Sequence, residues 1–163
     1  MIPGRFNTFK IRDFTAVVDF AHTPDGLEKI LVNVREFNPA RIICVFGGGG
    51  NRDKSKREIM GVIAAKHSDF VVVTSDNPRF ESPRGIILQI EAGVKSVIDD
   101  RYKSIEDRKS AVHFALDMAK AGDVVVIAGK GGEKFTEING KKIPYSDENV
   151  IEEYVTTQNN KVT

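Results

Sequence analysis

Residues 70–83 read Phe-Val-Val-Val-Thr-Ser-Asp-Asn-Pro-Arg-Phe-Glu-Ser-Pro, and this stretch decides the fold. Its first part, Phe70–Thr74, is a continuous apolar run typical of a buried strand. Its last part, Ser82-Pro83, favours a helix start, because serine caps the first turn and proline is tolerated at the first helical position. A strand, a short turn and a helix in this order are typical of an α/β fold with a parallel sheet.

The turn between that strand and helix, residues 76–79, places three polar groups on one loop. Asp76 supplies a carboxylate, Asn77 an amide and Arg79 a guanidinium, while Pro78 biases the residue before it away from helical geometry. Open α/β sheets bind ligands beyond the carboxyl ends of their strands, where an arginine can bind a carboxylate or a phosphate through two hydrogen bonds. The alternative is an ordinary turn closed by an Asx hydrogen bond.

Strand-like and helix-like segments alternate over most of the chain. Apolar strands separated by helices indicate a mostly parallel sheet covered on both faces, so we predict a Rossmann-like α/β fold. Strands are expected at Thr15–Phe20, Arg41–Phe46, Phe70–Thr74 and Val124–Ala128, with a short one at Val97-Ile98. Helices are expected from Thr23-Pro24 to Asn38-Pro39, from Ile59 to about His67, from Ser82-Pro83 to about Gly93, and from a capping box at Ser104–Asp107 to a left-handed cap at Gly122.

The pattern changes after the last apolar strand. Asn139-Gly140 is a strong signal for a tight β-hairpin, and Phe135–Ile138 and Lys141–Ile143 flank it. We expect this hairpin to add an antiparallel edge to the sheet. A short helix is expected from Asp147 to Tyr154, and the polar residues 157–163 are expected to form a frayed tail after a single domain of residues 1–156.

Composition narrows the class of protein. The chain has 163 residues, of which 40% are hydrophobic and 29% charged, and its net charge is +1. These values are typical of one globular domain and give no reason to expect nucleic-acid binding. The apolar runs are too short to span a bilayer and no signal-peptide pattern opens the sequence, so we expect a cytoplasmic protein without membrane contact. Cys44 lies in an apolar run and is expected to be a buried, inert thiol.

The sequence contains no recognisable pattern for catalysis or metal binding. His22, His67 and His113 are scattered without metal-ligand spacing, and neither Cys44 nor the serines have a patterned base. The phosphate-binding pattern G-x-x-x-x-G-K-[ST] does not occur. We therefore expect no catalytic residue and no metal site in this chain.

Further loops follow predicted strands and belong to the same edge of the sheet as residues 76–79. Asp19 and His22 precede a helix start that suits an anion, although they can equally be a strand-end acceptor and a packing residue. Gly47–Gly50 can bring backbone amides close to an anion beside Arg52, or can be a plain glycine linker.

The loop at residues 128–133 again combines small residues with opposite charges. Gly129 permits close backbone approach, and Lys130 and Glu133 carry a cation and a carboxylate. Across the loops, an ammonium group would suit the carboxylates and a carboxylate would suit the arginines. Complementary charge of this kind indicates a site for a zwitterion such as an amino acid, unless each residue has its own structural role.

The loops, taken in order, resemble motifs of the carboxy-terminal domain of the Mur ligases, the ATP-dependent amide ligases of bacterial peptidoglycan synthesis. Residues 19–25 resemble the run D-Y-A-H-T-P-D, with Phe20 in place of tyrosine. Residues 48–54 are similar to the loop G-G-D-R-D-K, with Asn51 in place of aspartate.

The two remaining motifs place the resemblance within the family. Residues 76–79 match D-N-P-R, and residues 129–133 are similar to G-K-G-H-E, with Gly132 in place of histidine. The resemblance covers nearly the whole chain and is greatest for the branch of UDP-N-acetylmuramoyl-tripeptide synthetases, which add the third residue of the stem peptide.

The resemblance implies a role for each matching position. The residues implied to bind the incoming diamino acid are Arg52, Asp76, Asn77, Pro78, Arg79, Gly129 and Glu133. Those implied to face the nucleotide are Arg5, Asp19 and His22. The D-N-P-R motif goes with meso-diaminopimelate, whose second carboxylate needs a cation. Because Gly132 removes an imidazole from this pocket, lanthionine is an alternative substrate.

The reaction implied by the resemblance has two steps. ATP, with Mg²⁺, phosphorylates the carboxylate of UDP-MurNAc-L-Ala-D-Glu, and the amino group of the new residue then attacks the acyl phosphate. The nucleotide, magnesium and UDP sites of the family belong to amino-terminal and central domains that this sequence does not contain. We therefore expect the chain to be a bacterial cytoplasmic ligase fragment for cell wall biogenesis, cell shape and cell division that is inactive alone.

Two alternatives remain from the sequence. One is the related folylpolyglutamate synthetase branch, whose domain would bind glutamate. The other is a non-enzymatic Rossmann-like module that binds a nucleotide or a protein partner and does not respond to amino acids.

Overall fold

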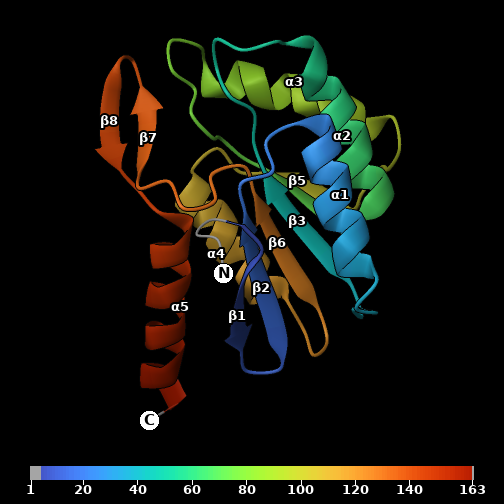
Figure 1. The fold of residues 1–163 in the computed structure, drawn as a ribbon, viewed down its shortest axis with the longest axis vertical. Coiled ribbons are helices and arrows are strands. Elements are labelled where there is room, and N and C mark those ends of the chain that lie inside the picture. The colour runs from blue at the N-terminus through green and yellow to red at the C-terminus, as the bar shows by residue number, and fades with distance from the viewer. Residues whose placement is uncertain (1–4, 163) are drawn as a thin grey trace.

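In the computed structural model, which describes residues 5–162, a six-stranded sheet forms the centre of the molecule (Figure 1). The strand order is β1-β2-β6-β3-β4-β5, and all neighbours are parallel except β1 and β2. The mostly parallel α/β fold is thus confirmed. The strands are β1 (Asn7–Ile11), β2 (Phe14–Asp19), β3 (Ile42–Phe46), β4 (Phe70–Val73), β5 (Tyr102–Ser104) and β6 (Val124–Ala128).

Helices cover both faces of this sheet. One face carries α1 (Pro24–Arg35), α2 (Ser55–His67) and α3 (Pro83–Lys95), and the other carries α4 (Arg108–Met118) and α5 (Asp147–Val162). Alternate residues of one strand therefore enter different cores. In β3, Cys44 and Phe46 belong to the core under α1–α3, and Ile43 and Val45 belong to the core under α4 and α5. This arrangement explains why the strands are apolar without alternation.

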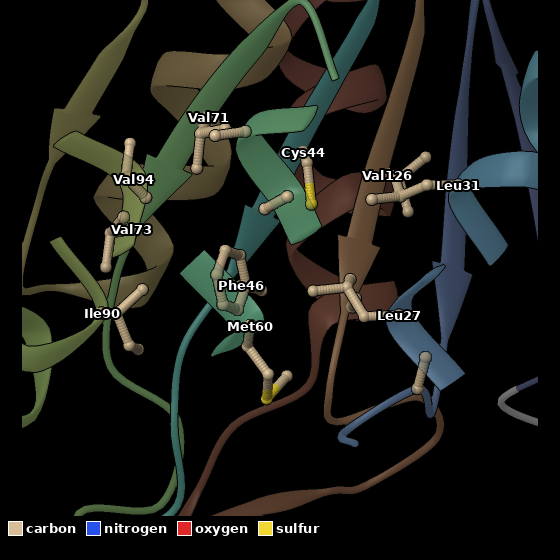
Figure 2. Packing of buried hydrophobic residues seen from close by; sticks show 14 of the residues in the cluster. Leu27, Leu31, Cys44, Phe46, Met60, Val71, Val73, Ile90, Val94 and Val126 are labelled. Atoms are coloured by element: carbon tan, nitrogen blue, oxygen red, sulfur yellow. The ribbon is translucent and has the colours of Figure 1, made fainter. Parts of the chain in front are cut away.

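The core under α1–α3 contains the single cysteine of the chain. Figure 2 shows Cys44 and Phe46 among side chains of the covering helices, including Leu27 of α1, Met60 of α2 and Ile90 of α3. Burial raises the pKa of the Cys44 thiol to about 12. The expectation of a buried thiol is confirmed, and a raised pKa is typical of a thiol of low reactivity.

Side-chain caps fix the helix starts behind the strand ends. The Thr23 hydroxyl accepts a hydrogen bond from the Gly26 amide at the start of α1, and the Ser82 hydroxyl accepts one from Gly85 at the start of α3. Both caps were predicted. The capping box predicted at 104–107 is wrong, because Asp107 itself caps α4 and accepts from the Ser110 amide.

The strand predicted at Val97-Ile98 is also wrong. The amides of both residues donate to the Val94 carbonyl and so extend the end of α3 as a turn. Ile98 is apolar because it closes the core under α3, not because it lies in the sheet. The edge strand is β5, and its Ser104, predicted to open the next helix, instead donates its hydroxyl to Glu91. Gly122 has the expected positive φ of 80°, but α4 already ends at Met118.

The predicted hairpin is confirmed as β7 (Phe135–Ile138) and β8 (Lys141–Pro144). It forms a separate two-stranded sheet rather than an edge of the main sheet (Figure 1). The antiparallel edge is β1, which sequence analysis did not find. The hairpin meets the rest of the molecule through a bridge between Arg79 and Ile138.

The carboxy-terminal helix is longer than predicted. α5 continues from Asp147 to Val162 and so extends through most of the segment for which a frayed tail was expected. Its buried residues Val150, Ile151 and Tyr154 pack into the core under α4 and α5. Among residues 5–162, no helix is both long and apolar enough to cross a membrane.

Candidate functional site

A cavity of about 450 Å³ lies where the loops after β2, β3, β4 and β6 meet, and we call it the rim cleft. This is the carboxyl edge of the sheet, where open α/β sheets bind ligands. The rim cleft brings together most of the residues predicted to bind a ligand. Among the residues that line it are His22, Arg52, Asp76, Asn77, Arg79, Gly129 and Glu133.

Arg79 is held in place by the hairpin. Its amide donates to the Glu137 carbonyl at 2.9 Å and its carbonyl accepts from the Asn139 amide at 2.8 Å. Its Nε donates to Glu137 Oε2 at 3.0 Å, and its Nη1 donates to the Gly50 carbonyl at 2.9 Å. These bonds maintain a left-handed backbone with φ of 53°, which costs a non-glycine residue about 1–2 kcal/mol. The hairpin thus aims the guanidinium at the rim cleft.

Asn77 uses its whole side-chain amide. Its Oδ1 accepts hydrogen bonds from Lys130 Nζ at 2.8 Å and from the Glu137 amide at 3.0 Å. Its Nδ2 donates to Glu133 Oε1 at 3.3 Å. The amide therefore joins the turn after β4 to the loop after β6 and to the hairpin.

The glycine loop lies against the same turn. A Cβ built on Gly49 would lie 3.1 Å from Arg79 Nη1 and 3.5 Å from Arg52 Cγ, so the two arginines flank this backbone. A Cβ on Gly50 would overlap the Pro78 carbonyl, which explains the glycine there. Pro78 is buried and does not line the rim cleft. In the structure Pro78 shapes the turn, and its contact with a ligand stays a prediction.

An ion pair between the buried Arg57 and the half-buried Glu81 anchors the glycine loop. Arg57 donates to both carboxylate oxygens of Glu81, at 3.1 and 2.8 Å, and to the Gly49 carbonyl at 2.8 Å. Glu81 also accepts from the Asn51 amide at 2.5 Å. The bonds from Arg57 and Asn51 lower the pKa of Glu81 to about 2. Sequence analysis did not identify this pair, because nothing in the sequence links these positions.

Two buried cations lie beside Asp76. Its Oδ1 is 3.8 Å from Lys130 Nζ and its Oδ2 is 3.9 Å from Arg108 Nη1. Burial lowers the pKa of the Lys130 ammonium, and the Asp76 carboxylate opposes that shift. Gly129 has φ of 118°, and a Cβ there would lie 2.6 Å from Asp76 Oδ2. The loop after β6 can therefore approach Asp76 only with glycine at this position.

Arg108 is fixed by a buried carboxylate that sequence analysis missed. Its Nε and Nη2 donate to the two oxygens of Asp147, at 2.9 and 2.8 Å. Although burial opposes it, Asp147 raises the pKa of Arg108. Arg108 also donates to the Ser75 and Ala128 carbonyls at the ends of β4 and β6. One signal was available, because an arginine opening a helix opposes the helix dipole and needs a partner.

The residues predicted to face a nucleotide lie apart from this network. Asp19 is buried and accepts from the Phe6 and Ala21 amides, both at 2.8 Å, and it does not line the rim cleft. Arg5 packs over the Phe20 ring at 5.2 Å. His22 is exposed, and its Nδ1 is 2.9 Å from the Phe20 carbonyl. Of the three, His22 is in the rim cleft.

The charges of the rim cleft suit an amino acid. Arg52 and Arg79 offer donors for a carboxylate, and Asp76 and Glu133 offer acceptors for an ammonium group. Among residues 5–162, no group of three or more His, Cys, Asp or Glu side chains is arranged to hold a metal ion. The rim cleft can bind and orient a charged small molecule.

Comparison with known sequences gives a consistent result. The family model described as "Mur ligase, glutamate ligase domain" matches residues 4–131. The chain is 51% identical over 153 residues to the UDP-N-acetylmuramoyl-L-alanyl-D-glutamate–2,6-diaminopimelate ligase of Syntrophomonas wolfei, covering 93% of this chain and 31% of that protein. The ligase of the same name from Aquifex aeolicus is 46% identical over 152 residues, covering 93% and 31%. The chain thus spans about a third of these relatives.

Solved structures agree. A UDP-N-acetylmuramoyl-L-alanyl-D-glutamate–2,6-diaminopimelate ligase superposes with a TM-score of 0.88 at 38% identity, covering 96% of this chain and 32% of the other. Escherichia coli FolC in complex with ADP superposes with a TM-score of 0.61 at 17% identity, covering 100% and 33%. The second likeness shows the shared fold alone.

Proposed function

The chain belongs to the Mur ligase family, and from that premise we propose that it is the amino-acid-binding domain of a diaminopimelate-adding ligase. In this proposal the complete ligase joins meso-diaminopimelate to UDP-MurNAc-L-Ala-D-Glu in the bacterial cytoplasm. The names of relatives up to 51% identical support this assignment.

The observation that supports the proposal is that Arg79 lines the rim cleft together with the carboxylates of Asp76 and Glu133. Meso-diaminopimelate has a carboxylate and an ammonium group at each end. Arg79 and Arg52 can bind one carboxylate, and Asp76 and Glu133 can accept from the ammonium beside it. Lysine would place its side-chain ammonium against the Arg79 guanidinium, and like charges in a partly enclosed cleft repel.

The residues of this chain would bind and orient the nucleophile. By holding the distal end of the diamino acid, the rim cleft leaves its other amino group free to attack the activated dipeptide. ATP would supply the phosphoryl group for that activation, and Mg²⁺ would neutralise phosphate charge. The described residues contain no cluster of metal ligands, so we assign ATP and Mg²⁺ mainly to the remaining two-thirds of the ligase. We propose that the nucleotide is faced by His22, which lines the rim cleft, and by Arg5, which packs on the ring of the lining residue Phe20.

Gly132 leaves the choice between two diamino dicarboxylates to experiment. It stands where the family motif has histidine, beside the Glu133 that lines the rim cleft. Lanthionine carries the same charged ends as meso-diaminopimelate, so the arginines would bind both. The assay below therefore includes lanthionine.

The test is a ligation assay of the full-length ligase that contains this chain. Meso-diaminopimelate, lanthionine, lysine and glutamate are compared by kcat/KM with ATP and UDP-MurNAc-L-Ala-D-Glu. We expect the dicarboxylates with two amino groups to be preferred. Arg79→Ala should lower kcat/KM for meso-diaminopimelate about 10- to 100-fold, the worth of one to two charge-assisted hydrogen bonds.

The matched control is Arg101→Ala. Arg101 is exposed and does not line the rim cleft. It precedes β5 and so lies at the amino ends of the strands, whereas the rim cleft lies at their carboxyl ends. Its loss should leave kcat/KM unchanged. Equal use of lysine and meso-diaminopimelate by the wild-type enzyme would refute the proposal, and preference for glutamate would favour the folylpolyglutamate synthetase branch.

A further inference from the structure

Lys130 is fully buried, although it carries an amino group at the end of a flexible chain. Its Nζ donates to Asn77 Oδ1 at 2.8 Å and to the Phe135 carbonyl at 3.0 Å. It also lies 3.5 Å from Glu133 Oε1 and 3.8 Å from Asp76 Oδ1. Its ammonium also lies over the Tyr145 ring, but the side chains of Asn77, Glu133 and Asp76 line the rim cleft, while Lys130 does not. Its influence on a ligand must therefore pass through them.

The contact with Asn77 decides which way the amide of that residue faces. A side-chain amide has one acceptor end and one donor end, and the two are almost equal in shape. Here two donors, Lys130 Nζ and the Glu137 amide, converge on the same end. Rotating the amide by half a turn would place its NH₂ group against both donors and leave buried groups unpaired. The acceptor end is thus fixed inward.

The fixed amide determines what Asn77 offers to the rim cleft. With Oδ1 turned inward, only Nδ2–H groups face outward, and one of them donates to Glu133. The side chains of Asn77 and Arg79 therefore both present donors to this end of the rim cleft. Such an end accepts a carboxylate and rejects an ammonium group, which has no lone pair to accept a hydrogen bond.

We propose that Lys130 is a positioning residue that makes the rim cleft select a carboxylate over an ammonium group at its Asn77–Arg79 end. This inference rests on the proposed function, because it concerns the distal end of the diamino acid. Without the Lys130 donor, one of the two hydrogen bonds that hold the Asn77 oxygen inward is lost, so turning this oxygen toward the cleft costs less free energy. That oxygen would accept a hydrogen bond from the side-chain ammonium of lysine. The difference in kcat/KM between meso-diaminopimelate and lysine would then be smaller.

The test compares two substitutions of similar length in the full-length ligase. Lys130→Met removes the donor, and Lys130→Gln keeps a neutral donor that can reach Asn77 Oδ1. The measured quantity is the ratio of kcat/KM for meso-diaminopimelate to kcat/KM for lysine. We expect Lys130→Met to lower this ratio about tenfold or more and Lys130→Gln to retain most of it. The control is Lys29→Met, at an exposed lysine of α1, which should leave the ratio unchanged.

A purely structural role for Lys130 gives a different result. If the lysine serves only packing or charge balance, Lys130→Met and Lys130→Gln should lower kcat/KM for both substrates equally and leave the ratio as in the wild type. That outcome overturns the inference while the proposed function stands. A wild-type enzyme that does not prefer meso-diaminopimelate overturns the proposed function itself.

A second variant covers the case in which Lys130→Met does not fold. Asn77→Asp retains Lys130 and replaces the outward donor by an acceptor. It should lower the same ratio about tenfold or more. An unchanged ratio in Asn77→Asp would overturn the inference, because the substrate would then not depend on a hydrogen bond from the donor end of Asn77.

Discussion

The carboxylates of Asp19 and Asp76 come from equivalent places in the fold but have different uses. Both are buried at the carboxyl ends of apolar strands, since Asp19 is the last residue of β2 and Asp76 lies in the turn after β4. Asp19 accepts backbone hydrogen bonds with both oxygens, from Ala21 two residues ahead and from Phe6 at the start of β1. The oxygens of Asp76 lie at ion-pair distance from buried cations and line the rim cleft.

The comparison shows that a carboxylate at a strand end is available to a ligand only when neighbouring groups do not already donate hydrogen bonds to its oxygens. Backbone amides donate to both oxygens of Asp19 and make it part of the loop. The buried cations beside Asp76 lie at ion-pair distances of 3.8 and 3.9 Å, which are longer than hydrogen bonds. The two carboxylates therefore differ because Asp76 has partners distant in sequence, above all Lys130 and Arg108.

The largest effect on the surroundings of Asp76 is expected from Asp147→Ala, which removes the partner of Arg108. This change leaves the fully enclosed Arg108 guanidinium without its bidentate partner. Breaking a buried ion pair in this way costs about 3–5 kcal/mol. The free energy of unfolding, measured by urea denaturation, should fall by that amount.

The matched control for this prediction is Asp117→Ala. Asp117 is exposed on α4 and accepts one hydrogen bond from the Tyr154 hydroxyl at 2.8 Å. Its loss should cost about 1 kcal/mol. Equal costs for the two variants would show that the Arg108 pair does not support the strand ends.

The direct comparison of the two carboxylates is Asp19→Asn against Asp76→Asn. In Asp19→Asn an NH₂ group meets a backbone N–H, so one buried donor loses its acceptor at a cost of about 1–3 kcal/mol. We expect a lower free energy of unfolding and an unchanged KM for meso-diaminopimelate. Asp76→Asn should raise that KM, because it removes a charged acceptor from the rim cleft.

The nucleotide role implied for Asp19 is tested by the same pair. The KM for ATP is measured in the full-length ligase for both variants. Because Asp19 has no free oxygen, we expect the KM for ATP to stay near the wild-type value in Asp19→Asn. A raised KM for ATP with unchanged stability would mean that Asp19 contacts the nucleotide.

The sequence was sufficient for the parts of the molecule that local chemistry controls. The apolar strands, the caps at Thr23 and Ser82 and the Asn139-Gly140 hairpin all follow from residues close together in the chain. The gathering of the loops at one edge follows from the parallel sheet alone. Each of these needs only periodicity, turn chemistry and the rule that parallel strands end on the same side.

The sequence was insufficient where partners are far apart. The hairpin could be predicted, but not that Glu137 would hold Arg79 across a gap of 58 positions. β1 was missed because its first buried position is the polar Asn7, which leaves only Phe9 and Ile11 to mark an alternating strand. The strand predicted at Val97-Ile98 failed because an apolar pair can close a helix end as well as enter a sheet. Long-range pairing, not propensity, decided these cases.

The smallest predicted effect concerns the pH dependence of stability through Glu81, which joins the turn after β4 to the glycine loop. Its pKa is lowered from about 4.5 to about 2 by Arg57 and the Asn51 amide. The unfolded state therefore binds a proton before the folded state does, so the stabilisation is complete above about 4.5 and is lost as the pH falls toward about 2. Water reaches part of the side chain and weakens the effect.

In Glu81→Gln, the free energy of unfolding should fall less steeply between pH 4.5 and about 2 than in the wild type. The control is Glu58→Gln, at an exposed glutamate of α2, which should keep the wild-type slope. Identical slopes in all three proteins would mean that the Asn51–Arg57 contacts do not hold Glu81 ionised, and the turn after β4 would then depend on its buried cations alone.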